Sequence, residues 1–302
     1  MERRDFGNTG MRVSILGFGG AEIGYGGTPQ PEVTTILNEA LDAGMNVIDT
    51  AECYADSEEK IGAAVSHRRK DFHLFTKVGH FSGDYAHEDY SAAGIARSID
   101  RSLQRLRTDV LDLVQLHSCS KATLQQGECI QALEDARAAG KTRFIGYSGD
   151  SFDALFAVET GRFDALQISV NIADQQSIDK VLPLAVARGM GIIAKRPLAN
   201  VAWKHEQEPT GSYSHTYWKR LRELKYAFLA RPLPEAVGIA LRFTLAQPGV
   251  ATAIVGTTKP GRWKENAAAL DSGGGGQLPV AGVNLIRARW KSVAKGDWVG
   301  QV

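Results

Sequence analysis

The sequence has few cysteines, no long apolar run and almost no excess of charge. Only three cysteines occur in 302 residues, at positions 53, 119 and 129, and no two of them have Cys-x-x-Cys spacing. This pattern argues against a disulfide framework or a structural zinc site and is typical of a reducing compartment. We therefore expect a cytoplasmic protein.

The chain also lacks the marks of a membrane or nucleic-acid protein. No apolar run approaches the roughly 18–20 residues that a transmembrane helix needs. Basic residues near the N-terminus are not followed by the apolar segment of a signal peptide. The net charge is +1, which gives no broad attraction to nucleic acid or to an anionic membrane. We expect neither of them as a partner.

Three common ligand-binding motifs are missing. The glycine-rich stretch at 17–20 resembles a dinucleotide loop, but Glu22 stands where the third glycine is required. The Gly-Lys-Thr at 140–142 lacks the upstream glycine of a P-loop, since that position is Asp135. There is no His-Glu-x-x-His, and the seven histidines show no metal-ligand spacing on a single element. We therefore expect no metal site.

What the sequence does contain is an alternation of apolar, β-rich segments with helical patterns. Several of the helical patterns begin at Ser or Pro and end before Gly. Eight such units favour an α/β protein with a (β/α)8 TIM barrel over an open doubly wound sheet. The expected strands are 13–16, 46–49, 73–77, 111–117, 144–148, 165–170, 191–195 and 251–256. The expected helices are 31–44, 57–68, 91–105, 128–139, 151–160, 177–188, 234–246 and 260–270.

We expect residues 1–302 to form one barrel domain, with a C-terminal tail from about residue 271. The glycine run at 273–276 is interpreted as a flexible connector to that tail. Two connections exceed ordinary loop lengths, at 78–90 after the third strand and at 196–233 after the seventh. Both would lie at the carboxyl ends of the strands, where barrel enzymes build their active sites.

Polar residues stand at the ends of three consecutive expected strands. Asp49 ends the second strand, with Tyr54 just beyond it; Lys77 ends the third and His117 the fourth. Each has an ordinary explanation alone, such as a turn cap, a strand-end lysine, a core histidine or an interface aromatic. A barrel would bring all four to one rim, and this joint placement indicates a functional site.

The chemistry of this set is that of a general acid. A tyrosine with a reference pKa near ~10 is a poor acid at neutral pH, but a nearby cation favours the phenolate. Lys77 can supply that cation, Asp49 can hold it, and His117 can hydrogen-bond the same substrate oxygen. Such a set suits a carbonyl that receives a hydride, which must come from a cofactor.

In this order and on these strands, the four residues resemble the catalytic tetrad of the aldo-keto reductase superfamily. The surrounding sequence agrees: GMNVIDTA at 44–51, LDLVQLH at 111–117 and GNTGMRVSILGFG at 7–19, the last similar to the bacterial branch. The resemblance runs from about residue 3 to residue 270. It implies a barrel oxidoreductase that uses NADP(H).

The resemblance also implies where NADP(H) would bind. Ser148 and Gln167 match positions that hold the nicotinamide carboxamide, and Arg262, at a helix start, can pair with a 2′-phosphate. The full implied set is Gly20, Asp49, Ser148, Gln167, Lys195, Arg196, Pro197, Leu198, Gly256, Thr257, Thr258, Arg262, Glu265 and Asn266.

Four departures from the family pattern lie among or beside these positions. Gly149 replaces an Asn found beside the Ser in many members, and Val170 replaces a Tyr. The segment KRPL at 195–198 replaces an aromatic-Ser-Pro-Leu segment that often stacks on the nicotinamide. Gly256 stands where some branches have a phosphate-binding Lys. We interpret Lys195 as covering the ring or contacting phosphate.

We therefore expect an NADPH-dependent reductase of aldehydes or ketones whose partner is a small carbonyl compound. Three alternatives are an NADP-dependent sugar or polyol dehydrogenase, an NADP(H)-binding regulatory subunit without turnover, and a metal-dependent barrel hydrolase. Substrate specificity should depend on the two long loops and on the residues near Glu22, Ile23, Tyr25 and Cys119. Trp203 and Trp218 are either a pocket wall or the packed core of the second long loop.

Overall fold

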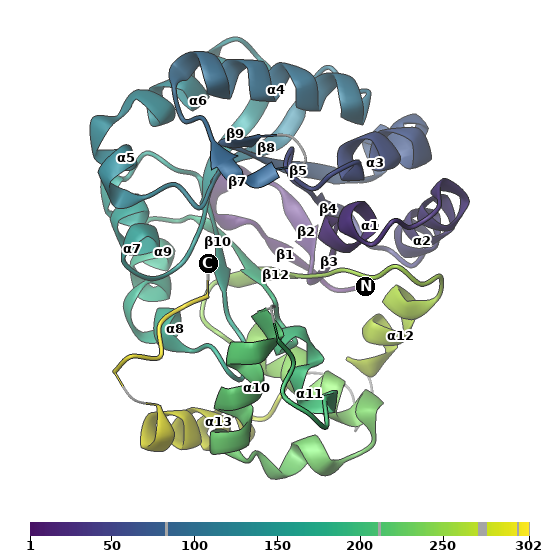
Figure 1. Cartoon of the computed structure of the whole chain (residues 1–302), viewed down its shortest axis with the longest axis vertical. Coiled ribbons are helices and arrows are strands. Elements are labelled where there is room, and N and C mark those ends of the chain that lie inside the picture. The colour runs from purple at the N-terminus through teal and green to yellow at the C-terminus, as the bar shows by residue number, and fades with distance from the viewer. Residues whose placement is uncertain (82–83, 211–212, 271–276, 295, 302) are drawn as a thin grey trace.

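Eight parallel strands close into a barrel in the computed structural model (Figure 1), which confirms the predicted fold class. The structure describes residues 1–81, 84–210, 213–270, 277–294 and 296–301. The barrel strands are largely buried because helices pack around the outside of the sheet. Around the barrel the strands are β3 (Leu16–Gly19), β4 (Val47–Asp49), β5 (His73–Val78), β8 (Leu111–His117), β9 (Thr142–Ser148), β10 (Ala165–Ser169), β11 (Gly191–Lys195) and β12 (Val250–Val255).

Helices surround the barrel near the expected places, but the helix expected at 57–68 ends at residue 65, the one expected at 177–188 is divided into two, and the short helices at 21–25 and 121–126 were not expected. The apolar stripe of α4 shows why such a segment packs: Ile95, Ile99 and Leu106 face the core, and Ser91 caps the helix by accepting from the Gly94 N–H at 3.1 Å. The surrounding helices are α1 (Ala21–Tyr25), α2 (Gln30–Asp42), α3 (Ser57–Val65), α4 (Ala92–Leu106), α5 (Lys121–Gln126), α6 (Glu128–Ala138), α7 (Ser151–Thr160), α8 (Gln176–Lys180), α9 (Leu182–Ala187), α11 (Leu233–Leu245) and α12 (Arg262–Ala269).

The first barrel strand lies further along the chain than expected. The prediction of a strand at 13–16 merged two elements, because β2 (Arg12–Ser14) pairs antiparallel with β1 (Arg3–Asp5) instead of joining the barrel. This hairpin lies across the amino end of the barrel. Phe6, which follows β1, stacks on Phe75 inside the barrel at 5.5 Å between ring centroids. The hairpin therefore closes the end opposite to the active-site rim.

The two long connections contain secondary structure of their own. After β5, the chain forms a hairpin of β6 (His80–Phe81) and β7 (Asp84–Glu88). After β11 come η3 (Ala199–Lys204), α10 (Tyr213–Leu224) and η4 (Ala227–Ala230). Tyr217, Leu221 and Leu224 of α10 are buried, so the second connection is a packed helical segment rather than an open loop.

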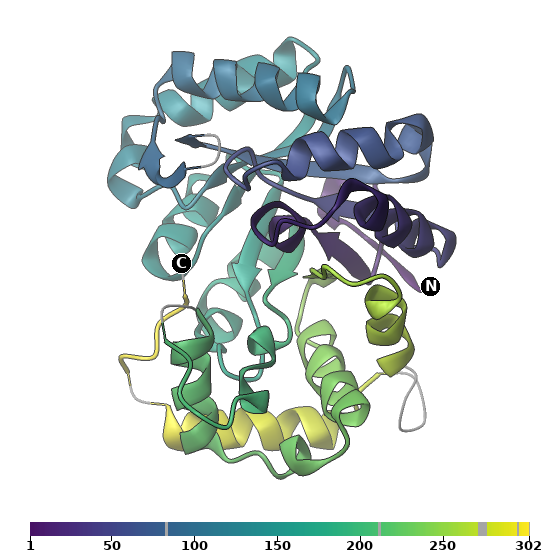
Figure 2. The same ribbon diagram turned by 45° about the vertical axis from the view of Figure 1, so that its right-hand side comes forward.

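The C-terminal tail packs against the barrel. Helix α13 (Val280–Val293) lies beside α10 (Figure 2), and its Trp290 contacts Trp298 with ring centroids 5.1 Å apart. The chain then returns to the rim, where the Gln301 N–H donates to Asp174 at 3.2 Å. The glycine run at 273–276 lies outside the described residues. Among the helices that the structure describes, none is long and apolar enough to cross a membrane.

Candidate active site

A pocket of about 700 Å³ opens at the carboxyl ends of the barrel strands. Its wall combines strand ends with α1 and the start of the connection after β11. The residues that line it are Gly19, Gly20, Ala21, Glu22, Tyr25, Asp49, Tyr54, His117, Ser118, Ser148, Gln167, Lys195, Arg196, Pro197, Leu198, Asn200, Val201, Ile254, Val255 and Gly256. Three of the four residues predicted as a tetrad are among them.

The fourth, Lys77, lies just beneath the pocket floor and contacts two of the others. Its ammonium Nζ is 2.5 Å from Asp49 Oδ2 and donates to the Thr50 carbonyl at 2.8 Å. Both side chains of this ion pair are almost fully buried, at 1% and 2% exposure. The same Nζ lies 5.0 Å from the centre of the Tyr54 ring. The barrel therefore brings the acid, the cation and the phenol together as the sequence predicted.

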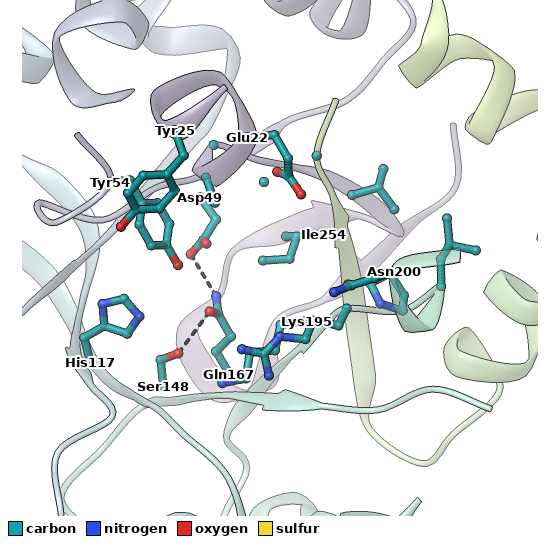
Figure 3. Close-up of a pocket in the computed structure, with 18 of the residues that line it drawn as sticks. Glu22, Tyr25, Asp49, Tyr54, His117, Ser148, Gln167, Lys195, Asn200 and Ile254 are labelled. Atoms are coloured by element: carbon teal, nitrogen blue, oxygen red, sulfur yellow. Dashed lines mark hydrogen bonds between the residues drawn. The ribbon is translucent and has the colours of Figure 1, made fainter. Parts of the chain in front are cut away.

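Asp49 is held from its other oxygen by two amides. Gln115 donates to Asp49 Oδ1 at 3.2 Å and Gln167 donates at 2.8 Å. Gln167 in turn accepts from Ser148 Oγ at 3.0 Å, so that a chain of hydrogen bonds crosses the pocket floor (Figure 3). This network fixes the carboxylate and leaves the lysine little freedom to move.

Tyr54 is positioned by a close approach of α1. A Cβ atom at Gly24 would lie 2.0 Å from the Tyr54 carbonyl oxygen, so only glycine lets the two segments meet. The Tyr54 ring meets the His117 ring edge-on, with centroids 5.6 Å apart, and lies 5.7 Å from the Tyr25 ring. Phenol and imidazole therefore face the same space (Figure 3).

His117 is a neutral imidazole near neutral pH. Burial and the positive charges of Lys77, His80 and Lys195 hold its pKa well below the usual value. Its Nδ1 lies 3.4 Å from Cys53 Sγ, and its backbone carbonyl accepts from His80 Nε2 at 2.8 Å. The ring can hydrogen-bond a substrate oxygen without bringing a charge into the pocket.

A second buried ion pair lies on the opposite wall. Lys195 Nζ, at the end of β11, is 2.8 Å from Asp150 Oδ2. Asp150 also accepts from the Ser169 N–H at 2.8 Å, and Arg196 Nη1 donates to Ser169 Oγ at 3.1 Å. Burial lowers the pKa of Lys195, although the charge of Asp150 opposes this effect.

The positions implied for the cofactor divide into two groups. Those that line the pocket are Gly20, Asp49, Ser148, Gln167, Lys195, Arg196, Pro197, Leu198 and Gly256. Those that do not line it are Thr257, Thr258, Arg262, Glu265 and Asn266. Arg262 is 45% exposed on α12, where its Nη1 pairs with Glu265 Oε2 at 3.0 Å. The structure therefore does not bring the second group to the pocket wall.

The expected specificity residues also divide. Glu22 and Tyr25 line the pocket, whereas Ile23 is buried in the core and Cys119 lies behind the wall with its Sγ 3.9 Å from that of Cys129. Neither tryptophan of the second long connection belongs to the pocket lining. Trp218 donates to the His205 carbonyl at 2.9 Å, and Trp203 packs on the core, which favours the structural alternative.

Sequence reasoning missed Gln115 and Asp150. An amide side chain between the apolar residues Val114 and Leu116 of the buried strand β8 was the available signal for Gln115. For Asp150 the signal was a carboxylate two residues beyond the end of β9. Neither signal identifies the residue that would be contacted, because Asp49, the partner of Gln115, and Lys195, the partner of Asp150, lie on other strands.

Within the residues that the structure describes, no group of three metal-binding side chains occurs. The fold and pocket instead define a barrel enzyme with an acid, a lysine, a phenol and an imidazole at one rim. The model of the aldo/keto reductase family matches residues 15–272, so this chain belongs to that family.

Known relatives cover nearly the whole chain. It is 30% identical over 285 residues to L-galactose dehydrogenase of Arabidopsis thaliana, with 89% of this chain and 88% of that protein covered. It is 29% identical over 321 residues to D-threo-aldose 1-dehydrogenase of a Pseudomonas species, with 92% and 96% covered. The holo structure of an aldo-keto reductase from Bacillus halodurans matches with a TM-score of 0.83 and 28% identity, covering 99% of both chains.

These relationships make the protein an oxidoreductase that acts on carbonyl or alcohol groups. Members of the family generally use NAD(P)H. The hydrolase alternative is thereby wrong, and the expectation of an oxidoreductase is confirmed.

Proposed function

We propose that this protein is an NADPH-dependent reductase of aldehydes or ketones in which Tyr54 is the general acid. The observation that carries the proposal is the buried Asp49–Lys77 pair, whose ammonium lies 5.0 Å from the centre of the Tyr54 ring. A cation so close to a phenol favours its ionised form and lets it release a proton near neutral pH.

The pocket has the polar groups that a nicotinamide nucleotide needs. The Ser148 hydroxyl and the Gln167 amide lie 3.0 Å apart and together offer donors and acceptors to a carboxamide. Lys195 and Arg196 bring positive charge suited to ring or phosphate contacts. When bound, the reduced nicotinamide supplies a hydride.

The side chains of this chain supply the rest of the reaction. The neutral His117 ring orients the carbonyl oxygen by a hydrogen bond. As the carbonyl carbon gains the hydride, the electron pair of the C=O π bond moves to oxygen, which takes the proton of the Tyr54 hydroxyl. Lys77 stabilises the phenolate that remains, and Asp49 holds the Lys77 ammonium in place.

Replacement of Tyr54 by Phe tests the proposal. We expect the reduction rate to fall about 10²–10⁴-fold, the usual contribution of a positioned acid, with NADPH affinity measured by fluorescence titration nearly unchanged. Tyr25→Phe is the matched control, because it removes a phenol from the same wall whose hydroxyl donates to the Cys53 carbonyl at 2.8 Å. Retained turnover in Tyr54→Phe would exclude Tyr54 as the proton donor.

The preference for NADP(H) over NAD(H) is a separate part of the proposal. Arg262 lies on the first turn of α12, where it can exchange its exposed partner Glu265 for a 2′-phosphate. Arg262→Gln should weaken NADPH binding and leave NADH binding as it was. An equal loss of affinity for NADPH and NADH would show that Arg262 does not bind the 2′-phosphate.

A second candidate function is an NADP-dependent sugar or polyol dehydrogenase. Two of the relatives described above are named as sugar dehydrogenases. The polar side chains of Glu22 and Asn200 line the pocket (Figure 3) and are suited to hydrogen bonds with sugar hydroxyl groups, which supports this candidate. Initial rates on a panel of aldehydes with NADPH and a panel of aldoses with NADP⁺ separate the two directions. Tight nucleotide binding without turnover on either panel would instead support a regulatory subunit.

We also propose a cytoplasmic location. Cys53, Cys119 and Cys129 are all buried and free, as expected in a reducing compartment. Cell fractionation with an antibody to the chain tests this.

A further inference from the structure

The end of β11 carries two adjacent cations at the pocket wall. Lys195 is 9% exposed and lines the pocket, at the position where the family resemblance implies an aromatic ring stacked on the nicotinamide. Arg196 follows with a left-handed backbone, φ 53°. An aromatic ring and an ammonium differ in one important respect, because the face of an aromatic ring attracts a positively charged ring whereas an ammonium repels it.

The Lys195 ammonium is tied toward one side of the pocket. Its partner Asp150 follows β9, two strands away, so the side chain reaches across β10. Ser148 ends β9 and pairs directly in the sheet with Gln167, in the middle of β10. The tether therefore directs Lys195 toward Ser148 and Gln167 and away from β12, which pairs with β11 on its other side and is followed by Gly256.

The tether is firmly built. Asp150 is 2% exposed and accepts from Lys195 at 2.8 Å, from the Ser169 N–H at 2.8 Å and from Ser169 Oγ at 3.3 Å. With its oxygens so engaged, the carboxylate has a fixed orientation and fixes the ammonium in turn.

The charge balance of this wall is positive. On this wall Lys195 and Arg196 face the carboxylate of Asp150, so two cations meet one carboxylate, and the neighbouring Arg220 and Asp174 form a further ion pair. The field of these cations extends across the pocket, since Lys195 contributes to the lowered pKa of His117. An oxidised nicotinamide ring carries a positive charge, and a reduced one does not.

We propose that Lys195, held by Asp150, lies beside the nicotinamide and makes the site prefer the reduced cofactor to the oxidised one. This inference rests on the proposed function, because it requires a nicotinamide nucleotide in the pocket. Its consequence concerns direction. A site that stabilises the reduced cofactor takes up NADPH in preference to NADP⁺, as the proposed reductase needs. Once substrate is bound, the same preference shifts the equilibrium toward oxidation of an alcohol, the direction of the second candidate function, in which the carbinol carbon loses a hydride and the hydroxyl loses its proton to Tyr54.

The test measures dissociation constants of NADPH, NADP⁺ and 2′-phospho-ADP-ribose by calorimetry for the wild type, Lys195→Met and Lys195→Arg. We expect the wild type to bind NADPH at least about tenfold more tightly than NADP⁺, a difference of about 1.4 kcal/mol. Lys195→Met should remove most of this ratio by tightening NADP⁺ binding, whereas Lys195→Arg should keep it. Binding of 2′-phospho-ADP-ribose, which has no nicotinamide, should not change.

Other outcomes distinguish a failure of this inference from a failure of the proposed function on which it rests. If Lys195→Met weakens all three ligands equally, Lys195 binds phosphate and the inference is wrong. If the wild type binds no nicotinamide nucleotide, the proposed function itself fails. Because Lys195→Met leaves the buried Asp150 with only the more distant Arg196 as a cationic neighbour, at 4.0 Å, the double variant Asp150→Asn/Lys195→Met provides a neutral pair of similar shape. The ratio in that variant should also approach one, and a ratio equal to that of the wild type would overturn the inference.

Discussion

The Asp49–Lys77 ion pair offers a way to separate what stabilises the site from what makes it react. Both side chains are at most 2% exposed and their charged atoms are 2.5 Å apart. Removing one partner of a buried pair leaves the other charge without compensation, at a typical cost of about 3–5 kcal/mol. Replacing both by neutral residues of similar size is often close to neutral.

We therefore expect Lys77→Met to lower the free energy of unfolding by about 3–5 kcal/mol, a large part of the roughly 5–15 kcal/mol of an ordinary protein. The double variant Asp49→Asn/Lys77→Met should regain most of that loss, since an Asn side-chain oxygen still accepts from Gln115 and Gln167 as Asp49 does. Urea unfolding of both single variants and the double variant completes a double-mutant cycle.

Turnover should follow a different pattern. Neither Lys77→Met nor the double variant has a cation beside the Tyr54 ring, so both should lose reduction rate by about 10²–10⁴-fold. A double variant that is stable but inactive would show that the pair is required for the chemistry. Simple addition of the two single-variant losses in stability, or recovery of turnover in the double variant, would refute the reasoning.

Four further outcomes follow from the described contacts. Burial raises the pKa of Glu58 to about 7 from an ordinary 4.5, so this group stabilises the fold below pH 4.5 and loses its contribution as the pH rises to 7. Glu58→Gln should flatten the pH dependence of urea unfolding in that window by about 3 kcal/mol, at 1.36 kcal/mol per pH unit; unchanged slopes would contradict this. Gly24→Ala places a Cβ 2.0 Å from the Tyr54 carbonyl oxygen and should cost about 1–3 kcal/mol in urea unfolding, together with turnover. Gly282→Ala in α13 meets only ordinary contacts at 3.4 Å or more and should raise the free energy of unfolding by about 0.5–1 kcal/mol. If both glycine variants changed the free energy of unfolding in the same direction, this reasoning would be contradicted. Because the pKa of His117 lies well below its usual value, His117 should not titrate between pH 6 and 8. The pH dependence of the reduction rate in this range should therefore have the same shape in the wild type and in His117→Gln.

Much of the fold was predictable because its signals are local. Each strand–helix unit has its own apolar pattern and its own helix punctuation, and eight of them in series specify a closed parallel barrel. The hairpin β1–β2 was not predictable in the same way, since Val13 suits a barrel strand as well as an edge strand. The helix α10 was missed because the long connection after β11, in which it lies, contains no clear signal for the start of a helix.

The site residues were predictable where they stand at strand ends. A parallel barrel brings all those ends to one rim, so the sequence positions of Asp49, Lys77 and His117 were enough to predict a common site. The implied contact of Arg262 with the pocket could not be judged this way. Its place on α12 depends on how that helix packs, and its present partner is Glu265.

By itself, the sequence determined the order of the elements, the residues at the rim and the family to which the chain belongs. The tertiary structure alone decided which charges meet, because an ion pair depends on side-chain directions across strands that are far apart in the chain. Asp49 and Lys77 are separated by 28 residues, and Lys195 reaches past a whole strand to Asp150. That second pair gives the lysine at position 195 a testable role, which is to make the site bind the reduced cofactor more tightly than the oxidised one.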